Sequence, residues 1–283
     1  MTPFLSRHER LDRVGSTNDV VRDWLAAGTP EICLAVAGEQ TAGRGRDGRR
    51  WIAPPGAALL LSLGFRPSWL AADAAWRLAA VVSLAMAEAA EAEAGLPTGT
   101  IRLKWPNDLV IASDTAGAID VAGATGPGAL PDVRKLAGVL GETDGLGSDD
   151  PRVVVGLGLN AEWGAADFPP ELAGTMTSLR EAARRPIDPD AVLDGFLARL
   201  RPRVEALRAG AFNGPRWSDR QITTGHTVRL ETPAGYETVR ALGVDVSTGA
   251  LIVADPTVAA GERSVFVGEI THVRLAEPIA EAV

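Results

Sequence analysis

The sequence predicts an α+β fold in which helices flank a mixed β-sheet and a small all-β unit follows. Apolar residues recur at helical spacing in some segments, and continuous apolar runs of strand length lie between them. After about Trp217 the pattern changes to short alternating stretches separated by turn residues, which is typical of a small β-barrel or sandwich. We therefore expect two domains, residues 1–214 and residues 215–283.

Three segments are expected to be helical, and each has recognisable end signals. The first follows the side-chain oxygens of residues 16–18, which precede an apolar face, and it ends near Gly28. The second, residues 73–94, is rich in alanine and leucine and is stopped by glycine and proline. The third begins after Asp188, an N-cap residue followed by proline, and runs through Leu207.

The expected strands are short apolar or alternating runs bounded by turn residues. In the first domain they are residues 32–37, 58–65, 101–104, 135–142 and 152–159. In the second domain they are residues 227–230, 238–245, 251–254 and 264–268. Residues 113–133 lack periodicity and are crowded with Gly, Ala, Pro and Asp, so we expect a long, mobile loop there.

Composition excludes several classes of protein. With 46% apolar and 23% charged residues the chain is neither disordered nor fibrous. Its single cysteine cannot form an internal disulfide, and no apolar run is long enough to cross a membrane, so we expect a cytoplasmic protein. A net charge of −8 argues against a surface that binds nucleic acid, and any cationic site must therefore be local.

One local concentration of positive charge stands out. Residues 43–51 read GRGRDGRRW, so four arginines alternate with glycines that let the backbone approach a ligand. The planar guanidinium pairs with carboxylate or phosphate oxygens through two hydrogen bonds. We interpret the segment as an anion-binding loop, although a solvated basic loop or a nucleic-acid contact explains the segment by itself equally well.

Three further motifs combine charged or polar residues with strand ends. Residues 104–109 (KWPNDL) bring a cation, an amide and a carboxylate to one turn, which by itself is often merely structural. Lys135 heads an apolar strand, and residues 155–160 (VGLGLN) interrupt a strand with two glycines, which mark a bulge or a close approach. The histidines lack metal-ligand spacing, and there is no nucleophile elbow or P-loop.

Taken together and in this order, five motifs resemble those of biotin protein ligases. They are GSTN at 15–18, EQTAGRGR at 39–46 continuing to Trp51, KWPND at 104–108, KLAG at 135–138 and GLGLN at 156–160. The resemblance covers about residues 12–210 and, more loosely, the C-terminal unit. It implies a catalytic domain like that of class II aminoacyl-tRNA synthetases and a C-terminal SH3-like barrel. The segment 113–133 is longer than its counterpart in that family.

The resemblance also implies a two-step reaction. Biotin's carboxylate would attack the α-phosphate of ATP, giving biotinyl-5′-AMP and pyrophosphate, and the acyl group would then pass to a lysine. That lysine would belong to a biotin carboxyl carrier protein or domain of an acyl-CoA carboxylase. Mg²⁺ would accompany ATP, held largely by phosphate oxygens. Because two anions at 4 Å repel by about 1 kcal/mol in water and about 4 kcal/mol at an effective dielectric of 20, fixed cations are needed.

Residue by residue, the resemblance assigns three overlapping groups and no metal ligand. Biotin would be bound by Ser16, Thr17, Asn18, Gln40, Gly43, Arg44, Gly45, Arg46, Trp51, Lys135, Gly138, Gly156 and Gly158. ATP would be bound by Arg46, Arg49, Trp51, Lys104, Asn107, Asp108, Lys135 and Asn160. The catalytic residues would be Arg46, Lys135, Arg49, Lys104 and Asp108. We expect residues 43–51, which we call the arginine loop, to be disordered without ligand and to close over a bound ligand as a lid.

Other functions stay open at this point. A lipoate or octanoate ligase or transferase shares the scaffold and the acyl chemistry, but we expect a different glycine-rich motif and a histidine there. In a biotin-responsive DNA-binding regulator a winged helix-turn-helix precedes the ligase domain, and Ser16 comes too early for one. A carrier-binding module without catalysis would not need the complete set of charges. Relatives often pair through an edge strand, so a homodimer is one expected assembly.

Overall fold

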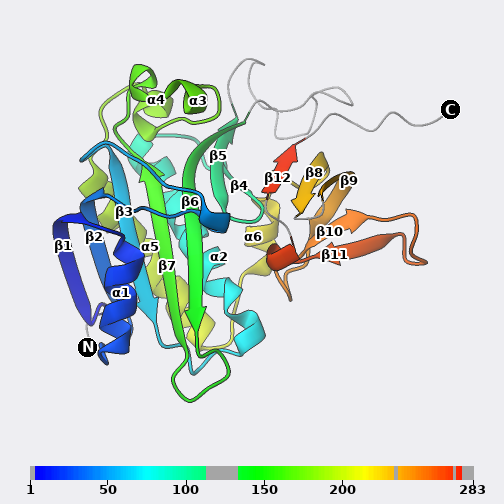
Figure 1. The fold of residues 1–283 in the computed structure, drawn as a ribbon, viewed down its shortest axis with the longest axis horizontal. Coiled ribbons are helices and arrows are strands. Elements are labelled where there is room, and N and C mark those ends of the chain that lie inside the picture. The colour runs from blue at the N-terminus through cyan, green and yellow to red at the C-terminus, as the bar shows by residue number, and fades with distance from the viewer. Residues whose placement is uncertain (1–3, 113–132, 233–234, 270–271, 276–283) are drawn as a thin grey trace.

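A seven-stranded mixed sheet organises most of the chain in the computed structural model, which describes residues 4–112, 133–232, 235–269 and 272–275 (Figure 1). Its strands are β1 (Arg7–Val14), β2 (Cys33–Gln40), β3 (Ala58–Phe65), β4 (Ile101–Lys104), β5 (Asp108–Ala112), β6 (Val133–Asp144) and β7 (Arg152–Asn160). Their order is β1-β2-β3-β7-β6-β5-β4. Only the β1–β2 pair is parallel among these neighbours.

Helices cover both faces of this sheet. Helix α1 (Thr17–Ala26) lies on one face, and helices α2 (Trp76–Ala94) and α5 (Pro189–Arg208) lie on the other (Figure 1). The central strand β3 is therefore buried along its whole length, which explains its nearly continuous apolar sequence. Helix α2 is apolar on almost every side because it is enclosed by the sheet and α5, and it ends at Gly95 in the left-handed conformation.

The close packing of α1 depends on a glycine in β3. A Cβ atom at Gly64 would lie 2.6 Å from Cys33 Sγ and 2.7 Å from Val21 Cγ1, so no larger residue fits without a shift. The helix begins after Ser16, as predicted, but the Ser16 side chain makes no capping hydrogen bond. The turn that starts α1 is consequently held by contacts from Thr17 and Asn18 to neighbouring elements, which are described below.

Several shorter elements accompany the first sheet and its long helices. They are the helices α3 (Pro170–Ala173), α4 (Leu179–Ala183) and α6 (Gly214–Asp219) and the 3-10 turns Arg46–Gly48, Ala72–Ala74 and Ala165–Asp167. Among the described helices none is long and apolar enough to cross a membrane.

A second, antiparallel sheet forms the C-terminal part. Its order is β11-β10-β9-β8-β12. The strands are β8 (Thr227–Thr232), β9 (Gly235–Val244), β10 (Leu251–Ala254), β11 (Glu262–Val265) and β12 (His272–Leu275), with a 3-10 turn at Val267–Glu269. Residues 220–222, which precede β8, are hydrogen-bonded to β4 through the main chain, from Leu103 N to Arg220 O (2.9 Å) and from Ile222 N to Leu103 O (2.8 Å).

A buried ion pair reinforces this connection. Arg220, only 7% exposed, forms two hydrogen bonds with Glu91 on α2, at 2.7 and 3.0 Å. The Glu91 carboxylate also accepts from the main-chain N–H groups of Gly99 and Ile101, each at 2.9 Å. Because every charge there is paired and hydrogen-bonded, α2, β4 and the C-terminal part are fixed relative to one another.

The α+β class and the mixed sheet flanked by helices are confirmed, and the expected bounds of β3 and β10 agree with the structure. Three strands were not predicted. Strand β1 is an edge strand whose charged side chains hide the strand pattern, while β5 and β12 are only five and four residues long. The strand expected at 264–268 instead spans Glu262–Val265. The loop expected at 113–133 lies, except for Val133, outside the described residues.

Candidate functional site

The arginine loop, the sheet and the C-terminal part enclose a pocket of about 840 Å³. All of the residues predicted to bind biotin or ATP line it, with the exceptions of Gly43 and Asn160. Residues from at least five separate stretches of chain therefore meet around one cavity. The pocket has a polar end, a glycine-lined floor and a cationic centre, and these are built by different elements.

The polar end is a hydrogen-bonded chain at the start of α1. Gln40 Oε1 accepts from Thr17 N at 2.7 Å and from Thr17 Oγ1 at 3.0 Å. The Ser62 hydroxyl lies 2.7 Å from Thr17 Oγ1 and 2.6 Å from Asn18 Oδ1. Asn18 is 4% exposed, and its Nδ2 has no hydrogen-bond partner among the described residues. An oriented, buried N–H donor is thus available to a ligand.

Three glycines form the floor of the pocket, on β6 and β7. Gly138 and Gly158 face each other across the two strands. A Cβ atom at Gly158 would lie 2.5 Å from Trp51 Cε2, and one at Gly156 would lie 2.1 Å from Asn18 Oδ1. Only glycine permits this approach, so the two-glycine motif marks a close contact with side chains rather than a bulge.

The cationic centre consists of two lysines and one carboxylate. Asp108 Oδ1 lies 2.6 Å from Lys135 Nζ, and Asp108 Oδ2 lies 3.4 Å from Lys104 Nζ. The strand pairing explains this arrangement, because Lys104 and Asp108 face each other across β4 and β5 while β6 brings Lys135 alongside. Two cations against one anion leave a net positive charge in the pocket.

Burial and charge compete in setting the pKa values of this centre. Burial opposes ionisation of Asp108, but the Lys135 and Lys104 ammonium groups outweigh it and hold the pKa of the carboxyl below its ordinary value. Desolvation lowers the pKa of the Lys104 ammonium, and Lys135 adds to this effect while Asp108 opposes it. Asp108 is therefore held as a carboxylate between the side chains of Lys104 and Lys135.

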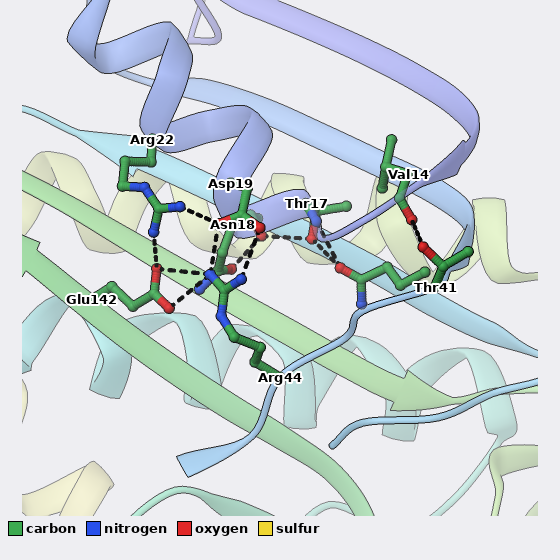
Figure 2. Close-up of polar contacts among 10 residues, drawn as sticks. Val14, Thr17, Asn18, Asp19, Arg22, Thr41, Arg44 and Glu142 are labelled. Carbon is green, nitrogen blue, oxygen red and sulfur yellow. Dashed lines mark hydrogen bonds and ion pairs between the residues drawn. The ribbon is translucent and has the colours of Figure 1, made fainter. Parts of the chain in front are cut away.

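The arginine loop is anchored by Arg44, as Figure 2 shows. Arg44 Nη1 lies 2.8 Å from Asp19 Oδ2 on α1, and Arg44 Nη2 lies 3.1 Å from Glu142 Oε1 on β6. The side-chain hydrogen bond between Arg44 and Asp19 lowers the pKa of the Asp19 carboxyl and raises the pKa of the Arg44 guanidinium. Arg22 contacts both carboxylates as well. Arg44 thus lines the pocket, but its charge is already engaged with protein carboxylates.

Arg46 connects the loop to the C-terminal part of the chain. Its Nη2 donates to the main-chain oxygen of Val267 at 2.8 Å, and its side chain is only 12% exposed. Burial lowers the pKa of the Arg46 guanidinium, which nevertheless stays charged near neutral pH. Arg49 lies nearby, with Nη2 3.5 Å from Asp47 Oδ2. Of the loop's arginines, Arg46 is the one held most deeply at the pocket.

Two of the predicted residues support the pocket from outside its wall. Asn160 is 1% exposed, and its Nδ2 donates to Thr177 O at 3.0 Å. A Cβ atom at Gly43 would lie 2.5 Å from the main-chain oxygen of Trp51, so Gly43 allows the two ends of the arginine loop to pair. Asn107 does line the pocket, and it also donates from Nδ2 to Val139 O at 3.0 Å.

The sequence reasoning missed several residues of the site. Ser62 is a fully buried hydroxyl in an otherwise apolar strand, and that isolated polar position was the available signal. The pocket is also lined by Val133, Glu171, Leu172, Thr175, Met176, Arg274 and Leu275. The wall from 171 to 176 consists of the end of the four-residue helix α3 and an isolated β-bridge between Met176 and Lys135. Such short elements leave no periodic pattern in the sequence.

A metal cage is absent from the described residues, where no three His, Cys, Asp or Glu side chains gather. The pocket lining contains two carboxylates, Asp108 and Glu171, and Asp108 is occupied by two lysines. This donor set fits a hydrated ion such as Mg²⁺ only if a substrate supplies most of the oxygen ligands.

Comparisons with known proteins agree with this geometry. The model of the biotin/lipoate A/B protein ligase family matches residues 11–160. The bifunctional ligase/repressor BirA of Bacillus spizizenii is 28% identical over 236 residues, covering 83% of this chain but only 65% of that protein. The biotin–(acetyl-CoA-carboxylase) ligase of Paracoccus denitrificans is 31% identical over 265 residues, which are 92% of this chain and 98% of that protein.

The fold has a close counterpart among solved structures. The biotin protein ligase from Aquifex aeolicus in complex with biotin and ATP superposes with a TM-score of 0.73, covering 95% of this chain and 99% of that chain. The two sequences are 24% identical, so this similarity concerns the architecture. The C-terminal sheet agrees with the small all-β unit expected after about Trp217.

Proposed function

The chain belongs to the biotin/lipoate A/B protein ligase family, and we propose that it is an ATP-dependent biotin protein ligase. The observation that carries the proposal is the convergence of Lys104, Lys135 and Arg46 on one pocket whose other end is a buried hydrogen-bonding chain. A small polar ring with a carboxylate tail fits the hydrogen-bonding end, and a nucleoside triphosphate fits the cationic end. The relatives' names support biotin as the acid that is activated.

In the first step, a carboxylate oxygen of biotin attacks the α-phosphorus of ATP. A P–O bond forms, the bond to pyrophosphate breaks, and biotinyl-5′-AMP remains. Lys135 and Lys104 stabilise the negative charge that collects around the phosphorus, and Arg46 holds the phosphates from the loop side. Because these cations are fixed before the substrates meet, little reorganisation is needed during the reaction.

In the second step, a lysine amine of a carrier protein attacks the acyl carbon of the mixed anhydride. A C–N bond forms, the C–O bond breaks so that AMP leaves with the electron pair, and the proton of the amine passes to solvent. Asp108, the carboxylate in contact with Lys135 and Lys104, orients the incoming amine once Lys135 has turned to the phosphate. Trp51, which lies over the glycine floor, keeps water from the anhydride together with the arginine loop.

The polar end suits the ureido ring of biotin, which has one carbonyl acceptor and two N–H donors. Asn18 Nδ2, a buried donor without a hydrogen-bond partner in the described part of the chain, would donate to the carbonyl. Ser16, Thr17 and Gln40 supply oxygen atoms around the ring. Ser62 holds Thr17 and Asn18 in place and acts as a positioning residue.

Mg²⁺ belongs to the proposal as the companion of ATP. When bound, it would neutralise charge on the triphosphate, with ligands drawn mainly from phosphate oxygens and water. Among the described residues, Asp108 and Glu171 are the carboxylates of the pocket lining that could contact its hydration shell.

The partner is proposed to be a biotin carboxyl carrier protein or domain, and the reaction is proposed to take place in the cytoplasm. Nucleic acid is not part of the proposal, because the net charge is −8. Strand β1 is an edge at which a homodimer could form by strand pairing, whereas β4 is already hydrogen-bonded to residues 220–222.

Pyrophosphate release from ATP in the presence of Mg²⁺ tests the function most simply, with biotin, lipoate and octanoate offered in parallel. The proposal predicts release with biotin alone of the three acids. Release with lipoate or octanoate, and none with biotin, would identify the lipoyl branch of the family instead.

A further inference from the structure

One face of the C-terminal sheet carries a cluster of cations to which the proposed reaction assigns no role. In antiparallel strands, residues directly opposite each other point to the same side. Arg274 on β12 lies opposite Arg229 on β8, Arg229 lies opposite Thr238 on β9, and Arg240 lies opposite Thr227. Arg229, Arg240 and Arg274 therefore share one face, which we call the basic face.

The basic face is turned to solvent, whereas the opposite face is core. Val228, Leu230 and Val273 alternate with the arginines and are fully buried. The Arg274 side chain is 56% exposed and the Arg229 side chain 42% exposed. The alternation of the strands thus separates an apolar side, which contributes to the core, from a charged side that faces solvent.

An exposed aromatic residue lies among these cations. Tyr236, which is opposite Glu231 on β8, is 71% exposed, and Arg229 Cζ lies 5.2 Å from the centre of its ring. Glu231 Oε1 bridges Arg229 Nη2 and Arg274 Nε, each at 2.9 Å, and so fixes both guanidinium groups. Pre-ordered arginines beside an exposed tyrosine are the composition that protein interfaces favour.

The basic face reaches the pocket. Arg274 belongs to both, because it lines the cavity and its charge contributes to the lowered pKa of Lys104. A macromolecule seated on this face therefore lies next to the place where the acyl group is handed over. The chain as a whole carries a net charge of −8, so a positive face is a local exception that attracts a negatively charged partner.

We propose that the basic face docks the protein that receives the acyl group, and that this partner presents acidic side chains around its acceptor lysine. The inference rests on the proposed function, since only a transfer to a protein requires such a surface. The complementary charges guide the partner into register and raise the rate of encounter, and Tyr236 contributes packed area. Adenylate formation does not involve Arg240 or Tyr236, which belong to the basic face but do not line the pocket.

The test separates the two half-reactions in the full-length enzyme. Arg240→Glu and Tyr236→Ser are compared with the wild type for pyrophosphate release, for transfer to a recombinant apo carboxyl carrier domain, and for transfer to hydroxylamine. Arg13→Glu is the matched control, because Arg13 is a 66% exposed arginine on β1, at the opposite edge of the molecule (Figure 1).

We expect kcat/KM for the carrier domain to fall about tenfold in Arg240→Glu and to become less sensitive to salt. Pyrophosphate release and transfer to hydroxylamine stay at wild-type values, and Arg13→Glu behaves as the wild type in all three assays. Unchanged carrier transfer in Arg240→Glu and Tyr236→Ser would overturn the proposal. Carrier transfer that stays intact while these variants lose binding to an oligonucleotide would also overturn the proposal, and it would assign the face to nucleic acid. Absence of pyrophosphate release from the wild type would instead refute the proposed function.

Discussion

Replacement of Gly156 by alanine probes the polar end of the pocket without removing any polar group. The added Cβ would lie 2.1 Å from Asn18 Oδ1 and 2.9 Å from Asn18 Cγ, so the amide has to move by more than 1 Å to reach ordinary contact distance. That movement breaks the 2.6 Å contact between Asn18 Oδ1 and the Ser62 hydroxyl. It also turns the buried donor Asn18 Nδ2 away from the ligand.

A misplaced buried amide costs about 1–3 kcal/mol, which corresponds to an increase of about 5- to 150-fold in KM for biotin. KM for ATP changes little, because Lys104, Lys135 and Asp108 do not contact Asn18. The assay is the initial rate of pyrophosphate release, with biotin and ATP varied separately.

Gly141→Ala is the matched control for this substitution. Gly141 lies on β6, adjacent to β7, and a Cβ atom there would meet nothing within 4 Å. We expect wild-type kinetics from this variant. The reasoning is refuted if Gly156→Ala leaves KM for biotin unchanged, or if Gly141→Ala raises it equally.

Three further predictions concern the charges. Asp108 has a pKa below its ordinary value of 3.8, so its ionised form stabilises the fold above about pH 4, and this stability is lost as the pH falls through the lowered pKa. In Asp108→Asn the free energy of unfolding, measured with urea, should therefore depend less on pH in the acid range. Glu91→Gln leaves Arg220 buried without its counter-ion and should lower the free energy of unfolding by about 3–5 kcal/mol, whereas a loss below about 1 kcal/mol would contradict a tightly paired site. Asp19→Asn weakens the anchor of Arg44, so trypsin should cut the arginine loop faster than in the wild type, and added biotin should slow the cutting. Equal cutting of variant and wild type would argue against the anchor, and equal cutting with and without biotin would argue against the lid.

The sequence was most informative where a motif combines glycine with charge. The arginine loop and KWPND could be placed at one site because, together with three further motifs in the same order, they resemble the motifs of biotin protein ligases. Sequence alone did not reveal that Arg44 is paired with Asp19 and Glu142, because the carboxylates come from different elements that only the fold brings together.

Other parts of the molecule gave weaker signals. Strand β1 pairs with β2 along an exposed edge, where charged residues replace the apolar alternation that normally indicates a strand. Asn160 ends a motif of the site, yet it bonds to Thr177 behind the pocket, and nothing in the spacing distinguishes a wall residue from its support. The division into residues 1–214 and 215–283 stays a prediction.

The most direct test of the account is the single-turnover rate of biotinyl-5′-AMP formation in Lys135→Ala and Arg46→Ala at saturating biotin and ATP. Lys104 still neutralises Asp108 in the first variant, so the site stays folded. Loss of one fixed cation from a closed site should slow adenylate formation by about 10²- to 10³-fold while the melting temperature changes little. Adenylate formation at the wild-type rate in both variants would show that the converging cations do not drive the reaction.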